Sequence, residues 1–178
     1  MADHILFLRH FETKLNKEKR ISGRSLEMTI LEPQNIVGDF AVDHVICSPA
    51  VRCRQTLQAF LRDRQVEDVC YVPELVERDM GLLEGRLRSE MAKEYPLLFN
   101  DGKFCLFETP PQGESYKMFY DRVKECWEAH LKTQDGTILI CSHNQFLKML
   151  YLIILDIPVT EEHWERIYFQ NGTVVKIV

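Results

Sequence analysis

The sequence predicts an α/β fold of three layers, in which a mainly parallel central sheet lies between two layers of helices. Short apolar runs alternate along the chain with longer segments whose apolar residues recur at helical spacing. Most of these runs are apolar throughout, as expected for parallel strands that are covered on both faces. A chain of 178 residues has the length of one compact domain, so we expect a single domain over residues 1–178.

Five segments have the composition of strands. Two of them end abruptly in a histidine, and the last contains Asn171-Gly172, a favoured two-residue turn that predicts a hairpin. The five segments are 4–9, 43–47, 69–72, 137–141 and 165–177.

Helices are predicted between these strands. Ser48-Pro49 indicates a helix start, with Ser48 as the N-cap and Pro49 in the first helical position. Residues 115–132 carry large apolar side chains at helical spacing. Residues 145–155 are apolar nearly all round, which predicts a helix buried among other elements.

The stretch from Pro96 to Gly113 is the best candidate for a long insertion that covers the substrate. A solvated connection without contact to the substrate explains its composition equally well. If it covers a pocket, we expect Lys103, Phe104 and Phe107 to contact the leaving group.

Composition excludes several classes of function. A net charge of −5 argues against non-specific binding of nucleic acid, and no run approaches the roughly 18 apolar residues of a membrane span. The apolar run 5–8 is too short for a secretory signal. The six cysteines form no CxxC pair, so we expect no metal site. We also expect the cysteines to be reduced thiols in the cytoplasm, and we expect no cofactor. The oligomeric state is left open.

The chemistry is indicated by the two histidines that end strands. His10 follows Arg9, and His143 follows Ser142. In an open α/β sheet ligands bind outside the carboxyl ends of the strands, so these side chains predict a cationic pocket that contains a nucleophile. Arg52 would join it from the first turn of a helix, where anions are favoured.

Transfer of a phosphoryl group suits these residue types. The planar fork of arginine donates paired hydrogen bonds to phosphate oxygens, and a neutral imidazole can attack phosphorus. A carboxylic acid must then protonate the leaving oxygen. Spacing alone does not choose among Glu74, Glu77, Asp79 and Glu84.

Five segments, in order along residues 9–144, resemble the motifs of the histidine phosphatase superfamily, the phosphoglycerate-mutase-like group, and most of all its small phosphatases. The motifs of that family are RHGE(S/T)xxN, SPxxRxxQT, LxExxxGxxEG, PxGES and SHG. The matching segments are Arg9-His10-x-Glu12-Thr13-x-x-Asn16, Ser48-Pro49-x-x-Arg52-x-x-Gln55-Thr56, Leu75-x-Glu77-x-x-x-Gly81-x-x-Glu84-Gly85, Pro111-x-Gly113-Glu114-Ser115 and Ser142-His143.

The resemblance implies a phosphoglycerate-mutase-like fold and a role for each matching residue. His10 would be the nucleophile that becomes phosphohistidine, and Glu77 would be the general acid and then the base that activates water. Asn16 would be a secondary contact to the substrate. The phosphoryl oxygens would be held by Arg9, Arg52 and His143.

Two residues depart from the family motifs. Phe11 and Asn144 stand where glycine is usual, and we expect both to contact the substrate. Because the backbone there passes close to phosphate, the bulky ring of Phe11 must point away or line the substrate side, where it would narrow the pocket or stack on a ring of the substrate. Asn144 suits a left-handed backbone better than most residues.

The function predicted from the sequence is that of a metal-independent phosphomonoester hydrolase, acting through a phosphohistidine on a small phosphorylated metabolite. A cofactor-dependent phosphoglycerate mutase is the first alternative, although such mutases usually carry a longer insertion after the segment matching Glu77-Arg78. A non-catalytic phosphate-binding module is the second alternative. A cysteine phosphatase is excluded, because no cysteine is followed by five residues and an arginine.

Overall fold

The central feature of the computed structural model is a five-stranded sheet with the strand order β3-β2-β6-β1-β7. The structure describes residues 2–36, 38, 40–66 and 68–178. The strands of this sheet are β1 (His4–Arg9), β2 (His44–Cys47), β3 (Asp68–Tyr71), β6 (Thr137–Ser142) and β7 (Val174–Lys176). The α-helices are α1 (Lys14–Lys17), α2 (Val51–Leu61), α3 (Arg88–Glu94), α4 (Tyr116–Cys126), α5 (Asn144–Ile154) and α6 (Glu161–Arg166).

The sheet is mainly parallel, as predicted. β1 pairs with β6, β6 with β2, and β2 with β3, all in parallel, whereas β7 lies antiparallel to β1. In the register of β1 with β6, Arg9 lies opposite Ser142. The two strands therefore end together, and His10 and His143 follow at the same edge of the sheet.

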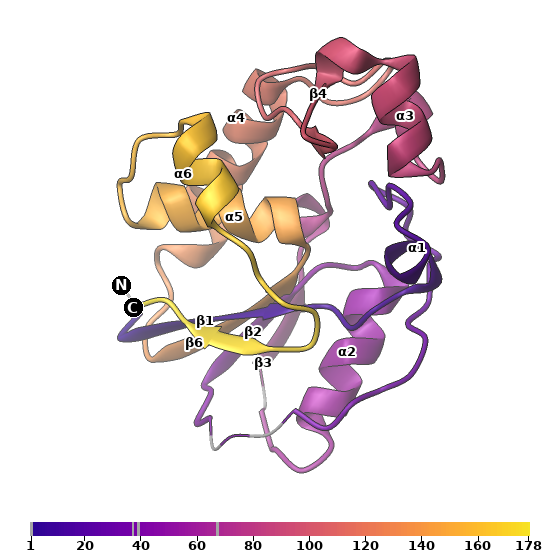
Figure 1. The fold of residues 1–178 in the computed structure, drawn as a ribbon. Coiled ribbons are helices and arrows are strands. Elements are labelled where there is room, and N and C mark those ends of the chain that lie inside the picture. The colour runs from indigo at the N-terminus through magenta and orange to yellow at the C-terminus, as the bar shows by residue number, and fades with distance from the viewer. Residues whose placement is uncertain (1, 37, 39, 67) are drawn as a thin grey trace.

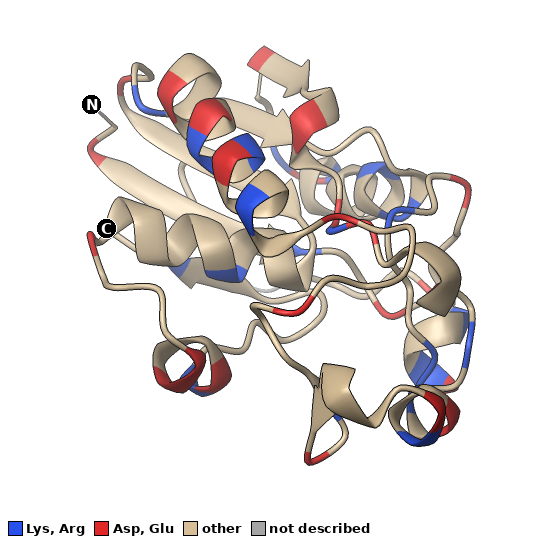
Figure 2. Cartoon of the chain, turned by 90° about the horizontal axis from the view of Figure 1, so that it is seen from above, with Lys and Arg blue, Asp and Glu red and all other residues tan. Residues whose placement is uncertain are grey.

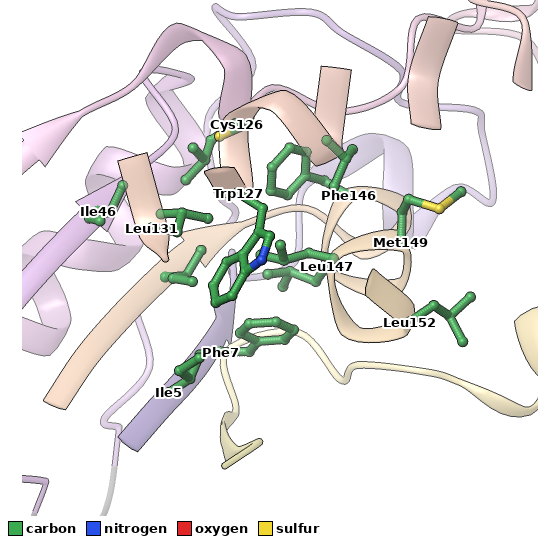
Figure 3. Close-up of a cluster of buried hydrophobic side chains, with 14 of the residues drawn as sticks. Ile5, Phe7, Ile46, Cys126, Trp127, Leu131, Phe146, Leu147, Met149 and Leu152 are labelled. Atoms are coloured by element: carbon green, nitrogen blue, oxygen red, sulfur yellow. The ribbon is translucent and has the colours of Figure 1, made fainter. Parts of the chain in front are cut away.

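Helices cover both faces of this sheet, which confirms the α/β prediction (Figure 1). Alternate residues of β1 belong to two separate clusters. Ile5 and Phe7 pack with apolar residues of α4 and α5, whereas Leu6 and Leu8 pack with residues of α2. Figure 3 shows the first cluster, in which the indole of Trp127 lies among side chains of β1 and α5.

The predicted C-terminal hairpin over 165–177 is wrong. The segment before the turn at Asn171-Gly172 contains the end of α6, and β7 alone is a strand. Thr160 caps α6 by accepting a hydrogen bond from the backbone of His163. The peptide groups of Phe169 bond to side chains of Arg9 and Asn144 in place of a strand partner. The cap of α6 and these side-chain hydrogen bonds therefore take the place of the expected pairing between strands.

The helix after β2 begins later than Ser48-Pro49 predicts. Ala50 is the N-cap of α2 and Val51 its first residue. The hydroxyl of Ser48 lies 3.0 Å from Nε2 of His143, and this contact takes the place of a cap on the helix. The other two predicted helices lie within a residue or two of α5 and of α4 with its π-helical continuation, Trp127–Leu131.

The segment 96–113 carries structure of its own. A turn of 3-10 helix (Pro96–Leu98) leads into the short hairpin of β4 (Phe99–Asn100) and β5 (Lys103–Phe104). The rings of Phe99 and Phe104 pack edge to face across it, with centroids 5.5 Å apart. In Figure 1 this hairpin lies close to α3 and well away from α2. Two further 3-10 turns, Pro73–Leu75 and Gly81–Leu83, precede it.

Charged residues lie mainly on the outer helices and connecting segments, and the strands of the central sheet carry few (Figure 2). Among the described residues, no helix combines the length and the apolar composition that crossing a membrane requires.

Replacing Leu139 with alanine tests the packing of the sheet. Leu139 is fully buried at the centre of β6, so Leu139→Ala should lower the free energy of unfolding by about 3 kcal/mol in urea titrations. Leu97→Ala is the matched control, because Leu97 is 87% exposed, and it should change stability by no more than about 0.5 kcal/mol. Equal losses from both variants would contradict the described core.

Candidate active site

The two histidines meet at the carboxyl edge of the sheet. The backbone N–H of His10 donates to the carbonyl of Ser142 at 3.1 Å, which ties the ends of β1 and β6 together. The two imidazole rings lie 5.3 Å apart between centroids, tilted by 58°. Both residues are buried: His10 is 3% exposed and His143 is 0% exposed. The sequence prediction that strand ends bring these residues together agrees with this geometry.

The hydrogen bond of His10 assigns the protonation of its ring. Nδ1 lies 2.6 Å from the carbonyl oxygen of Phe11, and a carbonyl can only accept. Nδ1 therefore carries the hydrogen, and in the neutral ring Nε2 keeps its lone pair. His10 also lines the cavity described below, so the ring nitrogen with the free lone pair is the one able to attack a ligand.

His143 has the opposite tautomer. Nε of Arg52 donates to Nδ1 of His143 at 3.2 Å, and because a guanidinium only donates, Nδ1 must be the acceptor. Nε2 then carries the hydrogen and donates to the hydroxyl of Ser48 at 3.0 Å. Arg52 is itself 1% exposed and also donates to the carbonyls of Gly23 and Ser25. His143 does not line the cavity in this arrangement.

Electrostatics keep both imidazoles neutral. Burial lowers the pKa of His10 well below its usual value, and the positive charges of Arg52 and Arg9 lower it further. Burial likewise lowers the pKa of His143, with added contributions from Arg52, His10, Arg9 and Arg122. Neutrality agrees with the tautomers assigned from hydrogen bonds and preserves the lone pair of His10.

Arg9 presents an unused donor. Its Nη1 donates to the carbonyl of Phe169 at 2.8 Å, and its guanidinium lies 5.5 Å from the ring centroid of Tyr168. Nε is buried and has no hydrogen-bond partner among the described residues. A buried N–H without a partner is costly, and an anion in the cavity would satisfy it.

Glu77 is the acid that reaches the site. Of the four acids that spacing left open, Glu77 alone lines the cavity. Its Oε1 accepts hydrogen bonds from the backbone of Arg78 at 3.0 Å and Phe146 at 3.1 Å, and its Oε2 accepts one from the backbone of Gln145 at 3.1 Å. These three donors orient the carboxylate at the first turn of α5.

A buried network of two arginines and Glu114 supports the Glu77 segment. Arg78, fully buried, donates to three carbonyls of residues 106–114. Arg122 donates to both carboxylate oxygens of Glu114 and to the carbonyls of Val76 and Glu77. Burial opposes ionisation of Glu114, yet the bonds from Arg122 outweigh it and lower the pKa of that carboxyl. The sequence analysis missed this network, since its members lie far apart along the chain.

Arg9, His10, Arg52 and Glu77 border one cavity of about 700 Å³. It is lined by segments from both halves of the chain, including the β4–β5 hairpin and α6. Basic side chains outnumber acidic ones in its wall, although the whole chain is acidic. The basic residues are Arg9, Lys19, Arg20, Arg52, Arg88, Lys103 and Lys148, and the acidic residues are Glu12, Glu77 and Glu165. Such a wall suits an anionic ligand.

The predicted contact residues divide into those that border the cavity and those that do not. Asn16 and Asn144 line it, although Asn16 also completes the capping box of α1. Asn144 begins α5, outside the left-handed region that its replacement of glycine suggested. Lys103 and Phe104 line the cavity, whereas Phe107 packs against Tyr116 with ring centroids 4.7 Å apart.

The expectation for Phe11 is wrong. Its side chain is 1% exposed and belongs to the core beneath α2, so its ring neither narrows the cavity nor lies where a substrate could stack. The ring packs so closely on Gly172 that a Cβ there would lie 2.4 Å from it. Only the backbone of Phe11 serves the site, through its carbonyl bond to His10 and its N–H bond to Thr56.

Within residues 2–36, 38, 40–66 and 68–178, no group of three or more His, Cys, Asp or Glu side chains is arranged to hold a metal ion. Metal independence remains a prediction that a chelator tests.

The sequence family follows from a match over most of the chain. A model of the histidine phosphatase superfamily (branch 1) matches residues 34–178. The chain belongs to the histidine phosphatase superfamily. This confirms the membership that the five motifs predicted.

Known relatives in this superfamily differ in their named activities. "Fructose-2,6-bisphosphatase TIGAR" of Xenopus laevis is 32% identical over 138 residues, which cover 70% of this chain and 48% of that protein. "Probable phosphoglycerate mutase GpmB" of Erwinia tasmaniensis is 27% identical over 186 residues, covering 97% and 83%. The chain spans about half the length of the first of these relatives.

A solved structure supports the fold assignment. The alpha-ribazole phosphatase from Shigella flexneri superposes with a TM-score of 0.74 at 25% sequence identity, and the match covers 97% of this chain and 89% of that one. The chain therefore shares its fold with a solved structure that is named as a phosphatase.

The neutral histidines predict how stability responds to acid. The unfolded chain protonates His10 and His143 near pH 6.5, whereas the folded protein resists protonation because burial lowers both pKa values. The unfolded state thus binds more protons below that pH, and the free energy of unfolding should fall as the pH drops from 7 to 5. His10→Gln should flatten this slope by up to about 1.4 kcal/mol per pH unit.

Chemical unfolding at several pH values measures these slopes. His130→Gln is the control, because His130 is exposed, and we expect it to keep the wild-type slope. An unchanged slope for His10→Gln would contradict the neutral assignment.

Proposed function

We propose that this chain is a metal-independent phosphomonoester hydrolase that acts through a phosphohistidine on a small phosphorylated metabolite. The observation that carries the proposal is the orientation of His10. Its Nδ1 is held by the carbonyl of Phe11, which leaves Nε2 as a nucleophile in a cavity whose wall also contains Arg9, Arg52 and Glu77.

In the first step Nε2 of His10 attacks phosphorus. The N–P bond forms as the bond from phosphorus to the ester oxygen breaks. The unpartnered Nε of Arg9 is available to a phosphoryl oxygen, and Arg52 adds a second guanidinium from the first turn of α2. His143, which donates to Ser48 and accepts from Arg52, contributes by fixing Arg52 and by turning its own N–H toward phosphate when the ligand is bound.

Glu77 acts as the general acid and then as the general base. In its protonated form it gives a proton to the leaving alkoxide, and as the carboxylate it then takes a proton from the water that attacks phosphohistidine. Water adds to phosphorus, the N–P bond breaks, and inorganic phosphate leaves with His10 restored. The backbone donors from α5 hold the carboxylate in one orientation through both steps.

The names of the relatives support hydrolysis but leave a mutase activity as an alternative. Two of the compared proteins are named as phosphatases, and one is named as a mutase. A mutase would return the phosphoryl group to a second position of the substrate instead of passing it to water. The same His10 and Glu77 serve either course, so product analysis must separate them.

We also propose that the chain works in a reducing compartment such as the cytoplasm. All six cysteines are free thiols, and burial raises the pKa of Cys126 to about 12. Thiols that persist unpaired are typical of proteins kept in reducing surroundings.

Phosphate release in the presence of EDTA tests the proposed function. Wild-type protein should hydrolyse simple phosphomonoesters with EDTA present, because the proposed chemistry uses side chains alone, and His10→Ala should lose at least about 1,000-fold in kcat because it lacks the nucleophile. An acid-labile phosphoryl adduct on wild-type protein, seen by mass spectrometry after rapid quenching, identifies the intermediate. Circular dichroism of the variant controls for folding.

The alternatives give different results in that assay. Hydrolysis that needs added metal, or that survives the loss of His10, would reject the mechanism. Isomerisation of phosphoglycerate that depends on bisphosphoglycerate would favour the mutase. Phosphate binding without turnover would favour the binding module.

The role of Glu77 is tested by the leaving group. Glu77→Gln should lower kcat by about 100-fold or more for an alkyl phosphate, whose alkoxide needs a proton, and by much less for p-nitrophenyl phosphate, whose phenolate leaves without one. Glu84→Gln is the control, because Glu84 accepts backbone hydrogen bonds from Arg24 and Met80 and does not line the cavity. Equal losses on both esters would show that Glu77 is not the acid.

A further inference from the structure

One buried lysine in the cavity wall is not used by the proposed chemistry. Lys148 is the only charged residue of α5, whose sequence is NQFLKMLYLII. Its side chain is 8% exposed, and its Nζ lies 4.1 Å from the ring centroid of Trp164. Among the described residues it makes no hydrogen bond and no ion pair. Nζ is not among the fully buried side-chain atoms that lack a partner. It therefore opens into the cavity that Lys148 lines, where an anionic ligand can accept its hydrogen bonds.

Lys148 lies apart from the proposed phosphoryl site. It follows Asn144 by four residues, so both lie on one face of α5, and both line the cavity. The helix rises about 6 Å over the four residues from Asn144 to Lys148. The positive charges that lower the pKa of His10 are those of Arg52 and Arg9, and Lys148 is not among them. We therefore assign to Lys148 an anion other than the phosphoryl group at His10.

The charges around Lys148 leave it available to a ligand. Its pKa is lowered to about 8, with burial as the largest cause. The charge of Lys103 also lowers this pKa, whereas the carboxylates of Glu77, Glu165 and Glu161 raise it. Glu77 accepts three backbone hydrogen bonds, and Glu165 pairs with Lys103 at 3.4 Å. The nearby acids thus raise the charged fraction of Lys148 without forming an ion pair with it.

We propose that Lys148 binds a second anionic group, a phosphate or a carboxylate, on the leaving portion of the substrate. The inference rests on the proposed function and names its substrate class, a phosphomonoester with a second anion a few ångströms from the ester. Trp164 positions the ammonium by stacking beneath it. Lys148 then determines specificity and takes no part in the transfer itself.

Three matched three-carbon esters test this assignment. Propyl phosphate has no second anion, 3-phosphooxypropanoate has a carboxylate, and propane-1,3-diyl bisphosphate has a second phosphate. Wild-type kcat/KM should be at least about tenfold higher for one or both of the esters that carry a second anionic group than for propyl phosphate. The preferred ester of the two identifies the anion.

Variants then test whether Lys148 causes the preference for an ester with a second anion. Lys148→Met keeps the length and the packing on Trp164 but removes the charge, so the ratio of kcat/KM for the preferred ester to that for propyl phosphate should fall about tenfold, through KM. Lys148→Arg should retain most of the ratio. Lys132→Met removes an exposed lysine outside the cavity and should leave the ratio unchanged.

The pH dependence of KM adds a measurement that a purely structural role of Lys148 would not affect. In wild type, KM for the preferred ester should rise above about pH 8 as Lys148 loses its proton, and in Lys148→Arg this rise should be absent. The profile for propyl phosphate should lack this rise in all variants.

Failure of this inference differs from failure of the proposed function. Turnover of all three esters with equal kcat/KM, or a ratio that Lys148→Met leaves intact, would overturn the role of Lys148 while hydrolysis stands. If no ester is hydrolysed, calorimetric titration with the bisphosphate decides: about tenfold weaker binding to Lys148→Met supports the subsite, and equal binding rejects it.

Discussion

The candidate site depends on the register between β1 and β6. Because Arg9 lies opposite Ser142, the strands end at the same level, and the backbone of His10 bonds to the carbonyl of Ser142. A shift of one residue would turn every side chain of a strand to the other face. The register is fixed by burial on both faces of the sheet, so the packing of the core also places the two imidazoles.

The sequence alone predicted the parts of the site that are encoded locally. The motif residues, the strands that end in histidine and the buried α5 are each specified by short stretches, and the structure brings His10, Arg9, Arg52, His143 and Glu77 together. Choosing Glu77 required the resemblance, and the geometry supports it because Glu77 is the only one of the four acids left open by spacing that reaches the cavity. Phe11 could not be placed from its motif, since the direction of its ring depends on Gly172, distant in sequence and adjacent in space.

Other features depended on contacts that no local pattern shows. The support of Glu77 by Arg78, Arg122 and Glu114 links segments far apart along the chain. The turn at Asn171-Gly172 forms, but the C-terminal hairpin failed as a prediction because the capped helix α6 and the bonds to Arg9 and Asn144 take the place of its first strand. Lys148 was detectable in principle, because a single charge in an apolar helix is a visible departure, but its direction required the structure.

The C-terminal segment joins the site at three backbone positions. Arg9 donates to the carbonyl of Phe169, Asn171 donates to the carbonyl of His10, and the N–H of Gly172 donates to the carbonyl of Arg9. The proposed nucleophile, His10, is thus held by residues made more than 150 positions later. During synthesis on the ribosome the candidate site cannot be completed until these residues emerge, so a nascent or prematurely ended chain would lack the assembled site.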